Sequence, residues 1–367
     1  MKTITKTLHQ LEANYIPEDI SSLNDVAFID IETTGFTAKL SQLYLIGCIV
    51  YNNGCFELHQ WFLETKEEEA TALLSFKQFI SSYKMLIHFN GNQFDIPYLN
   101  EKFEQNNIEF NLTHYKGLDL YRRIFPYKSF LKLPDLKQKT IETYLGILRE
   151  DLYTGKELID IYNGYRNSKD ENDLKLLLLH NEEDIMGMVQ ILSILSYVDL
   201  FNKPITVTKV QADTYNDIDG NPKQELIMKL KLSTCLPIRL SNHANGCLFS
   251  GFNDTATLKI PIIHEELKYF YANYKDYYYL PTEDMALHKS VGAFVDSAHR
   301  KQATAATCYT RKISEYLPQW DIIAEPFFKK EYRAKECYFE VTEEIKQDRA
   351  LFSRYASHIL KMIFENT

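Results

Sequence analysis

The chain has 367 residues, which is long for one domain, and its composition of 45% hydrophobic and 25% charged residues is typical of a globular protein. Its formal net charge is −9, and the first 200 residues hold 19 Lys and Arg against 29 Asp and Glu, which argues against a uniformly basic nucleic-acid-binding surface. The absence of a long apolar run, a signal peptide and any C-x-x-C pair predicts a cytoplasmic protein with reduced thiols, without a membrane segment, zinc site or disulfide framework.

The first part of the chain is expected to alternate strands with helices. Residues 1–24 are predicted to be a leader segment. Apolar, β-branched runs predict strands, an Asn-Asn-Gly stretch predicts a hairpin turn, and apolar residues at helical spacing predict helices. The predicted elements, in chain order, are a helix from Lys6 to Asn14, strands at 26–31, 44–51 and 55–62, a helix at 67–82 and a buried strand at 85–89.

Two carboxylates lie at the end of the strand at 26–31. Asp30 and Glu32 are two residues apart, so both project from the same face of the strand. Burying two carboxylates side by side is costly unless a positive group lies between them, and hard cations such as Mg²⁺ take oxygen ligands. The pair therefore indicates a metal site, although an exposed strand end with two solvated acids is the alternative.

A third acid follows the strand at 85–89. Asp95 lies in the first turn of a helix predicted from Phe94 to Phe103, where the helix dipole favours an anion. Taken by itself, this position favours an ordinary N-capping aspartate.

A basic window covers residues 116–139, with seven Lys and Arg against two Asp. We expect a run of helices there, followed by helices at 140–148 and 151–165. The window includes Arg122, Arg123 and Lys128, which we predict to contact phosphates beside the acidic site. The alternative is an ordinary solvated basic face.

A long helix is predicted at 173–192. Its acidic middle contains His180 and Asp184, which are four residues apart and therefore share one face of the helix. The alternative is an ion pair that only stabilises the helix at its surface.

Three segments that contain these residues stand in order along the chain: FIDIETTGF, LIHFNGNQFDIPYL and HNEEDIMGM. They resemble the three motifs of the DEDD (DnaQ-like) 3′→5′ exonuclease superfamily, and most closely the YprB-type ribonuclease H-like domain. The second segment is also similar to the proofreading domain of family B DNA polymerases. The resemblance covers about residues 25–198 and implies an α/β fold with a ribonuclease H-like mixed sheet flanked by helices.

The resemblance implies roles for individual residues. The four acids, Asp30, Glu32, Asp95 and Asp184, would hold two Mg²⁺ or Mn²⁺ ions, which is the arrangement that phosphodiester hydrolysis by two metals requires. His180 lies where one branch of the superfamily has a Tyr, whereas the branch with a His general base has it one residue earlier. Whether His180 deprotonates the attacking water or only orients it therefore stays open.

The resemblance also implies substrate-binding residues, namely Thr34 and Phe36 after the first motif and Asn90 in the second. The expected function for residues 25–200 is a 3′→5′ exonuclease that acts on single-stranded DNA or RNA. The alternatives are a catalytically inactive nucleic-acid-binding protein and a phosphodiesterase of short oligonucleotides. The sequence does not indicate whether the protein has protein partners.

Residues 201–367 are expected to form a second, mainly antiparallel α+β domain with an accessory role. Seven Tyr and Phe are interleaved with two Lys over 268–279, a pattern that can stack on single-stranded bases or fill the core of a β-sheet. The predicted strands are at 206–212, 225–234, 247–250 and 255–262, and the predicted helices are at 289–295 and 349–364.

Overall fold

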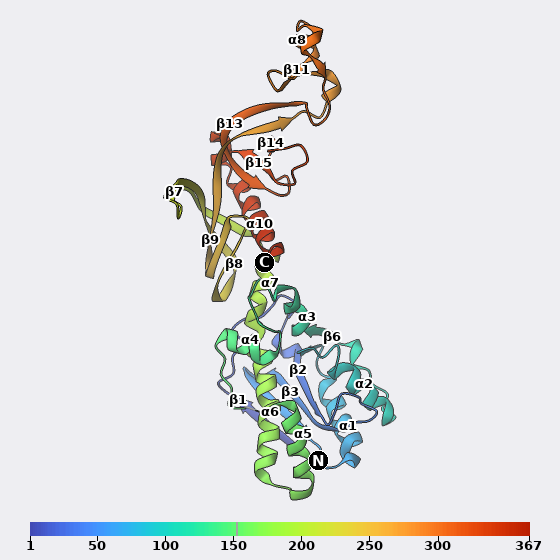
Figure 1. Cartoon of the computed structure of the whole chain (residues 1–367). Coiled ribbons are helices and arrows are strands. Elements are labelled where there is room, and N and C mark those ends of the chain that lie inside the picture. The colour runs from blue at the N-terminus through green and yellow to red at the C-terminus, as the bar shows by residue number, and fades with distance from the viewer. Residues whose placement is uncertain (152) are drawn as a thin grey trace. The chain divides into compact units, whose positions relative to one another are not determined.

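The computed structural model describes residues 1–151 and 153–367. It divides into two compact units, Met1–Val198 and Asp199–Thr367 (Figure 1).

The first unit is built on a mixed six-stranded sheet, which confirms the ribonuclease H-like class. The first four strands in the spatial order are antiparallel, and β2, β5 and β6 are parallel to one another. The spatial order is β1 (Lys2–Leu8), β4 (Cys55–Phe62), β3 (Leu43–Asn52), β2 (Val26–Thr33), β5 (Met85–His88) and β6 (Lys116–Asp119).

The N-terminal segment differs from its prediction. The helix expected from Lys6 to Asn14 is wrong, because Lys2–Leu8 forms the edge strand β1 and pairs with β4 along its whole length. Four of its seven residues, three Thr and one Ile, are β-branched, and β-branched residues favour strands. The predicted leader therefore supplies one strand of the sheet.

Helices cover both faces of this sheet (Figure 1). On one face, α1 and α2 pack on a core that includes Ala27, Ile29 and Ile31. On the other face, α5 and α6 pack around Tyr44 and Phe62. The helices are α1 (Glu69–Ile80), α2 (Asp95–Gln105), α3 (Leu120–Ile124), α4 (Gln138–Leu145), α5 (Gly155–Ser168), α6 (Glu171–Gln190) and α7 (Ser196–Asn202).

Two boundaries in this unit also differ from prediction. The basic window begins with the strand β6 instead of a helix, because Lys116–Asp119 pairs with β5 in parallel. The helix expected from residue 151 begins at Gly155, after the N-cap Thr154, whose side chain accepts a hydrogen bond from the backbone N–H of Glu157. Leu152, which this prediction included, lies outside the described residues.

One helical run, Glu171–Asn202, is long and apolar enough to cross a membrane by length and composition. In its most apolar window, however, 61% is buried within the structure, as in the core helix of a globular protein.

The second unit is mainly antiparallel, which confirms the α+β class. It contains a six-stranded sheet in the order β14-β15-β13-β9-β8-β7 and a three-stranded sheet in the order β11-β10-β12, and α10 packs against β7, β8 and β9. Its strands are β7 (Ile205–Asn216), β8 (Pro222–Ala244), β9 (Cys247–Phe270), β10 (Tyr277–Leu280), β11 (Met285–His288), β12 (Lys301–Gln302), β13 (Tyr309–Gln319), β14 (Phe327–Phe328) and β15 (Cys337–Glu340), and its helices are α8 (Lys289–Gly292), α9 (Glu343–Gln347) and α10 (Arg349–Glu365).

The strands predicted separately at 247–250 and 255–262 are parts of the single long strand β9. The aromatic run at 268–279 packs partly into a small core. Tyr271, Tyr277 and Tyr279 lie against the buried Ala286 and Cys308. This packing agrees with the alternative that the run fills a β-sheet core.

Candidate active site

The end of β2 carries two acids on the face that α6 covers. Asp30 accepts a hydrogen bond from the side-chain amide of Asn181 on α6 at 2.9 Å, and Asn181 in turn accepts one from Gln60 on β4 at 2.9 Å. Gly47 lies directly opposite Asp30 on β3, and a Cβ there would come within 2.0 Å of the Asn181 oxygen. A glycine at this position therefore lets α6 approach closely enough to hold Asp30.

Asp95 reaches the same strand from the first turn of α2. Its Oδ1 accepts a hydrogen bond from the backbone N–H of Ile31 at 3.2 Å. Strand β5 pairs with β2 only as far as Phe28, so the backbone beyond that point needs another partner. Asp95 is buried, with 5% of its surface exposed. The side chain thus sits against the strand segment that carries Asp30 and Glu32.

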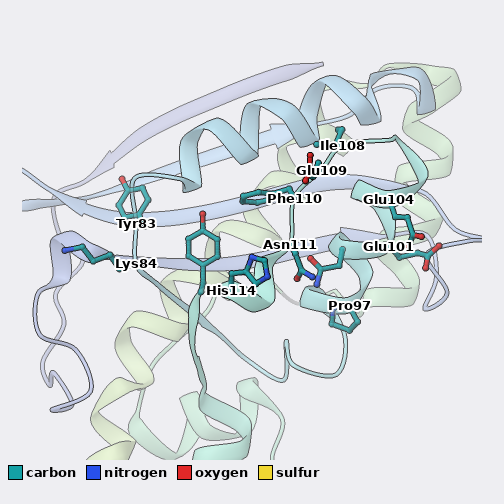
Figure 2. Close-up of a pocket in the computed structure, with 12 residues that line it drawn as sticks. Tyr83, Lys84, Pro97, Glu101, Glu104, Ile108, Glu109, Phe110, Asn111 and His114 are labelled. Carbon is teal, nitrogen blue, oxygen red and sulfur yellow. The ribbon is translucent and has the colours of Figure 1, made fainter.

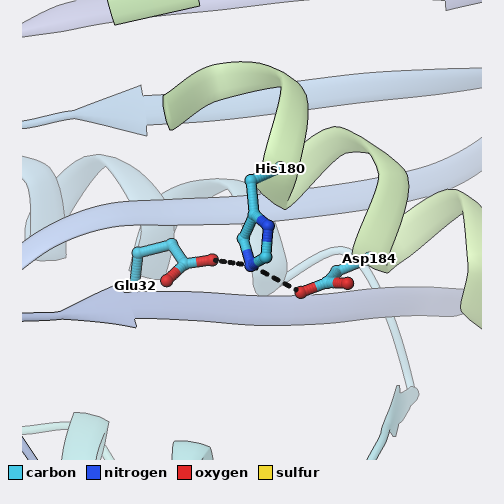
Figure 3. A group of neighbouring side chains, drawn as sticks. All are labelled: Glu32, His180 and Asp184. Atoms are coloured by element: carbon cyan, nitrogen blue, oxygen red, sulfur yellow. Dashed lines mark ion pairs between the residues drawn. The ribbon is translucent and has the colours of Figure 1, made fainter. Parts of the chain in front are cut away.

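The helix α6 contributes His180 and Asp184 (Figure 3). His180 Nε2 lies 3.5 Å from Glu32 Oε1 and 3.2 Å from Asp184 Oδ2, and one ligand atom from each of these three residues lies within 4.8 Å of the others. The pair His180 and Asp184 is therefore not a surface ion pair. The structure places both residues over the acids of β2.

The acids affect one another electrostatically. Burial raises the pKa of Asp30 well above its ordinary value, and the charges of Asp95, Asp184 and Glu32 raise it further, while the hydrogen bond from Asn181 lowers it. Burial and the charge of Asp184 likewise raise the pKa of Glu32. Burial raises the pKa of Asp95 to about 7, against the opposing effect of its hydrogen bonds to backbone N–H groups. Such mutual repulsion is what a bound cation would relieve.

The donor set fits a divalent metal ion. Carboxylate oxygens, here from β2, α2 and α6, are the ligands that Mg²⁺ and Mn²⁺ prefer, and the imidazole of His180 lies beside those of Glu32 and Asp184. Three of the four acids are also held by another group, namely Asn181 for Asp30, the Tyr44 hydroxyl at 3.3 Å for Glu32, and a backbone N–H for Asp95. Support of this kind orients ligands toward a metal.

Besides Asn181 and Tyr44, sequence reasoning missed two further residues that touch the site. Asp151 Oδ2 lies 2.7 Å from His180 Nδ1, and Arg149 forms ion pairs with Asp184 and Glu142. Both residues lie between α4 and α5, outside all three motifs. The motif spacing carried no signal for either.

Thr34, Phe36 and Asn90, which are predicted to bind substrate, differ from one another in their surroundings. Thr34 accepts a hydrogen bond from the backbone N–H of Gln42, and the ring of Phe36 is 92% exposed and lies edge-on to Phe94. Asn90 has a positive φ of 60°, and its Oδ1 is buried without a hydrogen-bond partner among the described residues. An unpaired buried acceptor of this kind fits a ligand that brings a donor.

Lys128 lines a pocket of about 570 Å³ together with Asn90, Tyr121 and Phe125. Gln138 also lines this pocket, and its side chain donates a 2.7 Å hydrogen bond to the backbone carbonyl of Asp184. The pocket therefore adjoins the acidic site. 

The two arginines of the basic window each contact an aspartate. Arg122 donates its backbone N–H to Asp119, and Arg123 pairs with Asp19. Their contact with phosphates stays a prediction.

A second pocket, of about 1070 Å³, lies elsewhere in the unit (Figure 2). It is lined by Glu101 and Glu104 from α2, by Lys84 just before β5, and by His114. None of the motif acids lines it.

Comparisons with known proteins found a family match in the part of the chain that carries this site. Residues 27–196 match the family model RNase_H_2, described as RNase_H superfamily. No curated protein sequence matches the chain. Among solved structures, the family B DNA polymerase from the hyperthermophilic archaeon Pyrobaculum calidifontis is similar with a TM-score of 0.38 and 15% identity, over 48% of this chain and 25% of the polymerase.

E. coli Exonuclease I in complex with a dT13 oligonucleotide is similar with a TM-score of 0.30 and 12% identity, over 56% of this chain and 54% of the exonuclease. The matched region thus spans less than two thirds of either structure. The match to the family model and the mixed sheet agree on the same part of the chain. Residues 27–196 therefore form a domain of the RNase H superfamily.

Proposed function

We propose that this protein is a metal-dependent 3′→5′ exonuclease that hydrolyses phosphodiester bonds at the 3′ end of single-stranded nucleic acid. One observation carries the proposal: Glu32 of β2 meets His180 and Asp184 of α6, and the charges of Asp30 and Asp95 act on these same acids. The RNase H superfamily domain supports a nuclease. The 3′→5′ direction and the single-stranded substrate rest on the resemblance of the three motifs to DEDD exonucleases.

In this proposal Asp30, Glu32, Asp95 and Asp184 hold the metal ions. Two divalent ions in such a site supply a nucleophilic water at neutral pH and stabilise the leaving 3′-oxygen. The protein's own part is to keep the four carboxylates in place, which Asn181 does for Asp30.

His180 is placed to receive a proton. Its Nδ1 faces Asp151 at 2.7 Å, so an N–H at Nδ1 donates to that carboxylate and leaves the lone pair on Nε2. Nε2 points toward Glu32 and Asp184, on the side where the attacking water would lie. In this arrangement Asp151 sets the orientation of the ring and His180 accepts the proton of the water.

The groups proposed to hold the substrate are near this site. The exposed ring of Phe36 offers a stacking surface for a terminal base, and Asn90 and Lys128 line one pocket beside Asp184. Arg122 and Arg123 would add contacts to phosphates further along the strand. All six cysteines are free thiols, which suits the cytoplasmic location that we also propose.

A panel of labelled strands tests the function. Single-stranded DNA and RNA of several lengths, labelled at the 5′ or the 3′ end, would be incubated with the full chain in Mg²⁺, Mn²⁺ or EDTA. We expect a ladder that shortens from the 3′ end in the 5′-labelled strands and immediate release of a labelled mononucleotide from the 3′-labelled strands. Both should require a divalent ion.

The same panel separates the alternatives. Binding without cleavage, at all lengths and with both metals, would support an inactive nucleic-acid-binding protein. Cleavage confined to strands of a few nucleotides would support a phosphodiesterase of short oligonucleotides, which the excess of acidic residues in the first 200 residues would suit. Asp160→Asn, a change at an exposed acid on α5, is a control that should behave as wild type.

A further inference from the structure

Arg149 lies between α4 and α5 and places its guanidinium against the acidic site. Its Nε and Nη2 donate to the buried carboxylate of Glu142 on α4, with Nη2 at 2.6 Å, and its Nη1 donates to Asp184 Oδ1. The side chain is only 9% exposed. A nearly buried cation therefore contacts one of the four acids that the proposed function assigns to metal ions.

The surroundings of Arg149 hold it in this position. Glu183, next to Asp184 on α6, accepts hydrogen bonds from the backbone N–H groups of Glu150 at 2.9 Å and Asp151 at 2.8 Å. On the other side, Gly187 of α6 leaves room for Glu142, because a Cβ there would lie 2.0 Å from Glu142 Oε1. The segment that carries Arg149 is thus fastened to the helix that carries Asp184.

Both oxygens of Asp184 have close neighbours. Oδ1 receives the hydrogen bond from Arg149, and Oδ2 lies 3.2 Å from His180 Nε2. An ion that uses Oδ1 must therefore replace the Nη1 contact of Arg149. The other two donors of the guanidinium stay on Glu142, so the side chain loses one contact and keeps a buried partner.

We propose, on the basis of the function proposed above, that Arg149 is a resident counter-ion of the metal site. It neutralises Asp184 when no ion is bound and gives up that carboxylate when a divalent ion enters. Arg149 then stabilises the ion-free protein and lowers its affinity for the ion, because binding must first break the contact with Asp184. It is a positioning residue, since its contacts are with Asp184 and Glu142.

Calorimetric titration of Mn²⁺ into the full-length chain tests this exchange without measuring activity. We expect Arg149→Gln to bind Mn²⁺ about 5- to 50-fold more tightly than wild type. Arg166→Gln removes the same charge from an exposed position on α5 and should change the affinity less than about twofold. The increase in melting temperature on adding Mn²⁺ should also be larger in Arg149→Gln than in wild type.

A second variant controls for a folding defect in Arg149→Gln. Arg149→Gln leaves Glu142 buried without its cation, whereas the double variant Arg149→Gln/Glu142→Gln replaces both charges by amides that can hydrogen-bond to each other. It should also bind Mn²⁺ more tightly than wild type.

Unchanged or weaker Mn²⁺ binding in both variants would overturn the role of Arg149 as a counter-ion. If wild type binds Mn²⁺ and degrades single strands but the variants show no gain in affinity, this inference fails and the proposed function stands. If wild type binds no divalent ion, both fail.

Discussion

In the first unit, the two ends of the parallel strands differ in the groups that a ligand could contact. At the start of β5 lies the pocket of about 1070 Å³ (Figure 2), and at the end of β2 lie the buried acids around His180 (Figure 3). Helix α2 contributes to both, with Asp95 in its first turn and Glu101 and Glu104 further along. Acidic residues of one helix, α2, therefore lie in two different environments.

The acids of the pocket are open to solvent. Glu104 is exposed, and Glu101 is half-buried and lies 3.7 Å from Lys39. Water screens such charges, so they generate little field of their own. Asp95, in contrast, is buried and its pKa is raised to about 7, chiefly by that burial. Shared burial of like charges, more than the size of a cavity, thus distinguishes the candidate metal site from the open pocket.

The largest effect should come from removing one acid at the end of β2. We expect Asp184→Asn to slow single-turnover cleavage by at least about 10³-fold in Mg²⁺, because it removes a ligand charge from the metal site. The matched change at the other end, Glu104→Gln, should leave the rate within about twofold of wild type. Equal rates in the two variants would remove the distinction between the two ends.

The next effect concerns the two histidines, one at each end. His180→Ala should slow single-turnover cleavage by roughly 10²–10⁴-fold, because it removes the proposed proton acceptor, whereas His114→Ala in the pocket should have no effect. Mn²⁺ affinity, measured by calorimetry, should stay within about threefold in His180→Ala. Loss of Mn²⁺ binding would instead make His180 a metal ligand beside Glu32 and Asp184.

The salt dependence of single-strand binding tests whether the basic window contacts phosphates beside the acidic end of the sheet. The triple change Arg122→Gln/Arg123→Gln/Lys128→Gln should weaken binding of a single strand and reduce the slope of log affinity against log salt by about 2, since each phosphate contact contributes about 0.7. The control triple change, at Lys39, Lys77 and Lys84, should leave the slope unaltered. An unchanged slope in the first variant would indicate a solvated basic face.

The smallest effect is on the stability of the metal-free protein. The pKa of Asp95 is raised from 3.8 to about 7, so its contribution to folding is greatest in acid and is lost as the pH rises from about 4 through 7. At pH 8 in EDTA, Asp95→Asn should raise the melting temperature by on the order of 5 °C, because Asn removes a buried charge and keeps an acceptor for Ile31.

At pH 3 the same change should have almost no effect, because Asp95 of the wild type carries its proton in the folded and in the unfolded state. Saturating Mn²⁺ should reverse the order at pH 8 and favour wild type. If Asp95→Asn instead melts at a lower temperature than wild type at pH 8 in EDTA, the ionised carboxylate of Asp95 does not destabilise the metal-free protein.

The spacing of apolar residues predicted most of the helices and strands of the first unit in their order along the chain. The strand at 55–62 and the helix near 67–82 are confirmed, since apolar spacing reports directly on which face is buried. Strands β1 and β6 were mistaken for helices. Both are short and exposed in part, so their pairing with β4 and β5 depends on neighbours far away in the sequence.

The sequence by itself determined which side chains share a face. Two-residue spacing put Asp30 and Glu32 together on β2, and four-residue spacing put His180 and Asp184 together on α6. These are local relations, which follow from the geometry of one strand or one helix. Only the tertiary structure decided how α6 meets β2, because that depends on Gly47 and Asn181 on different elements.

The tertiary structure also brought Arg149 to Asp184 and Asp151 to His180. These pairs are separated by about thirty residues and lie outside any periodic pattern. Their meeting depends on how the chain between α4 and α5 folds back onto α6, where Glu183 binds its backbone. Spacing along one element cannot encode a contact of that kind, because its geometry is set by packing between elements.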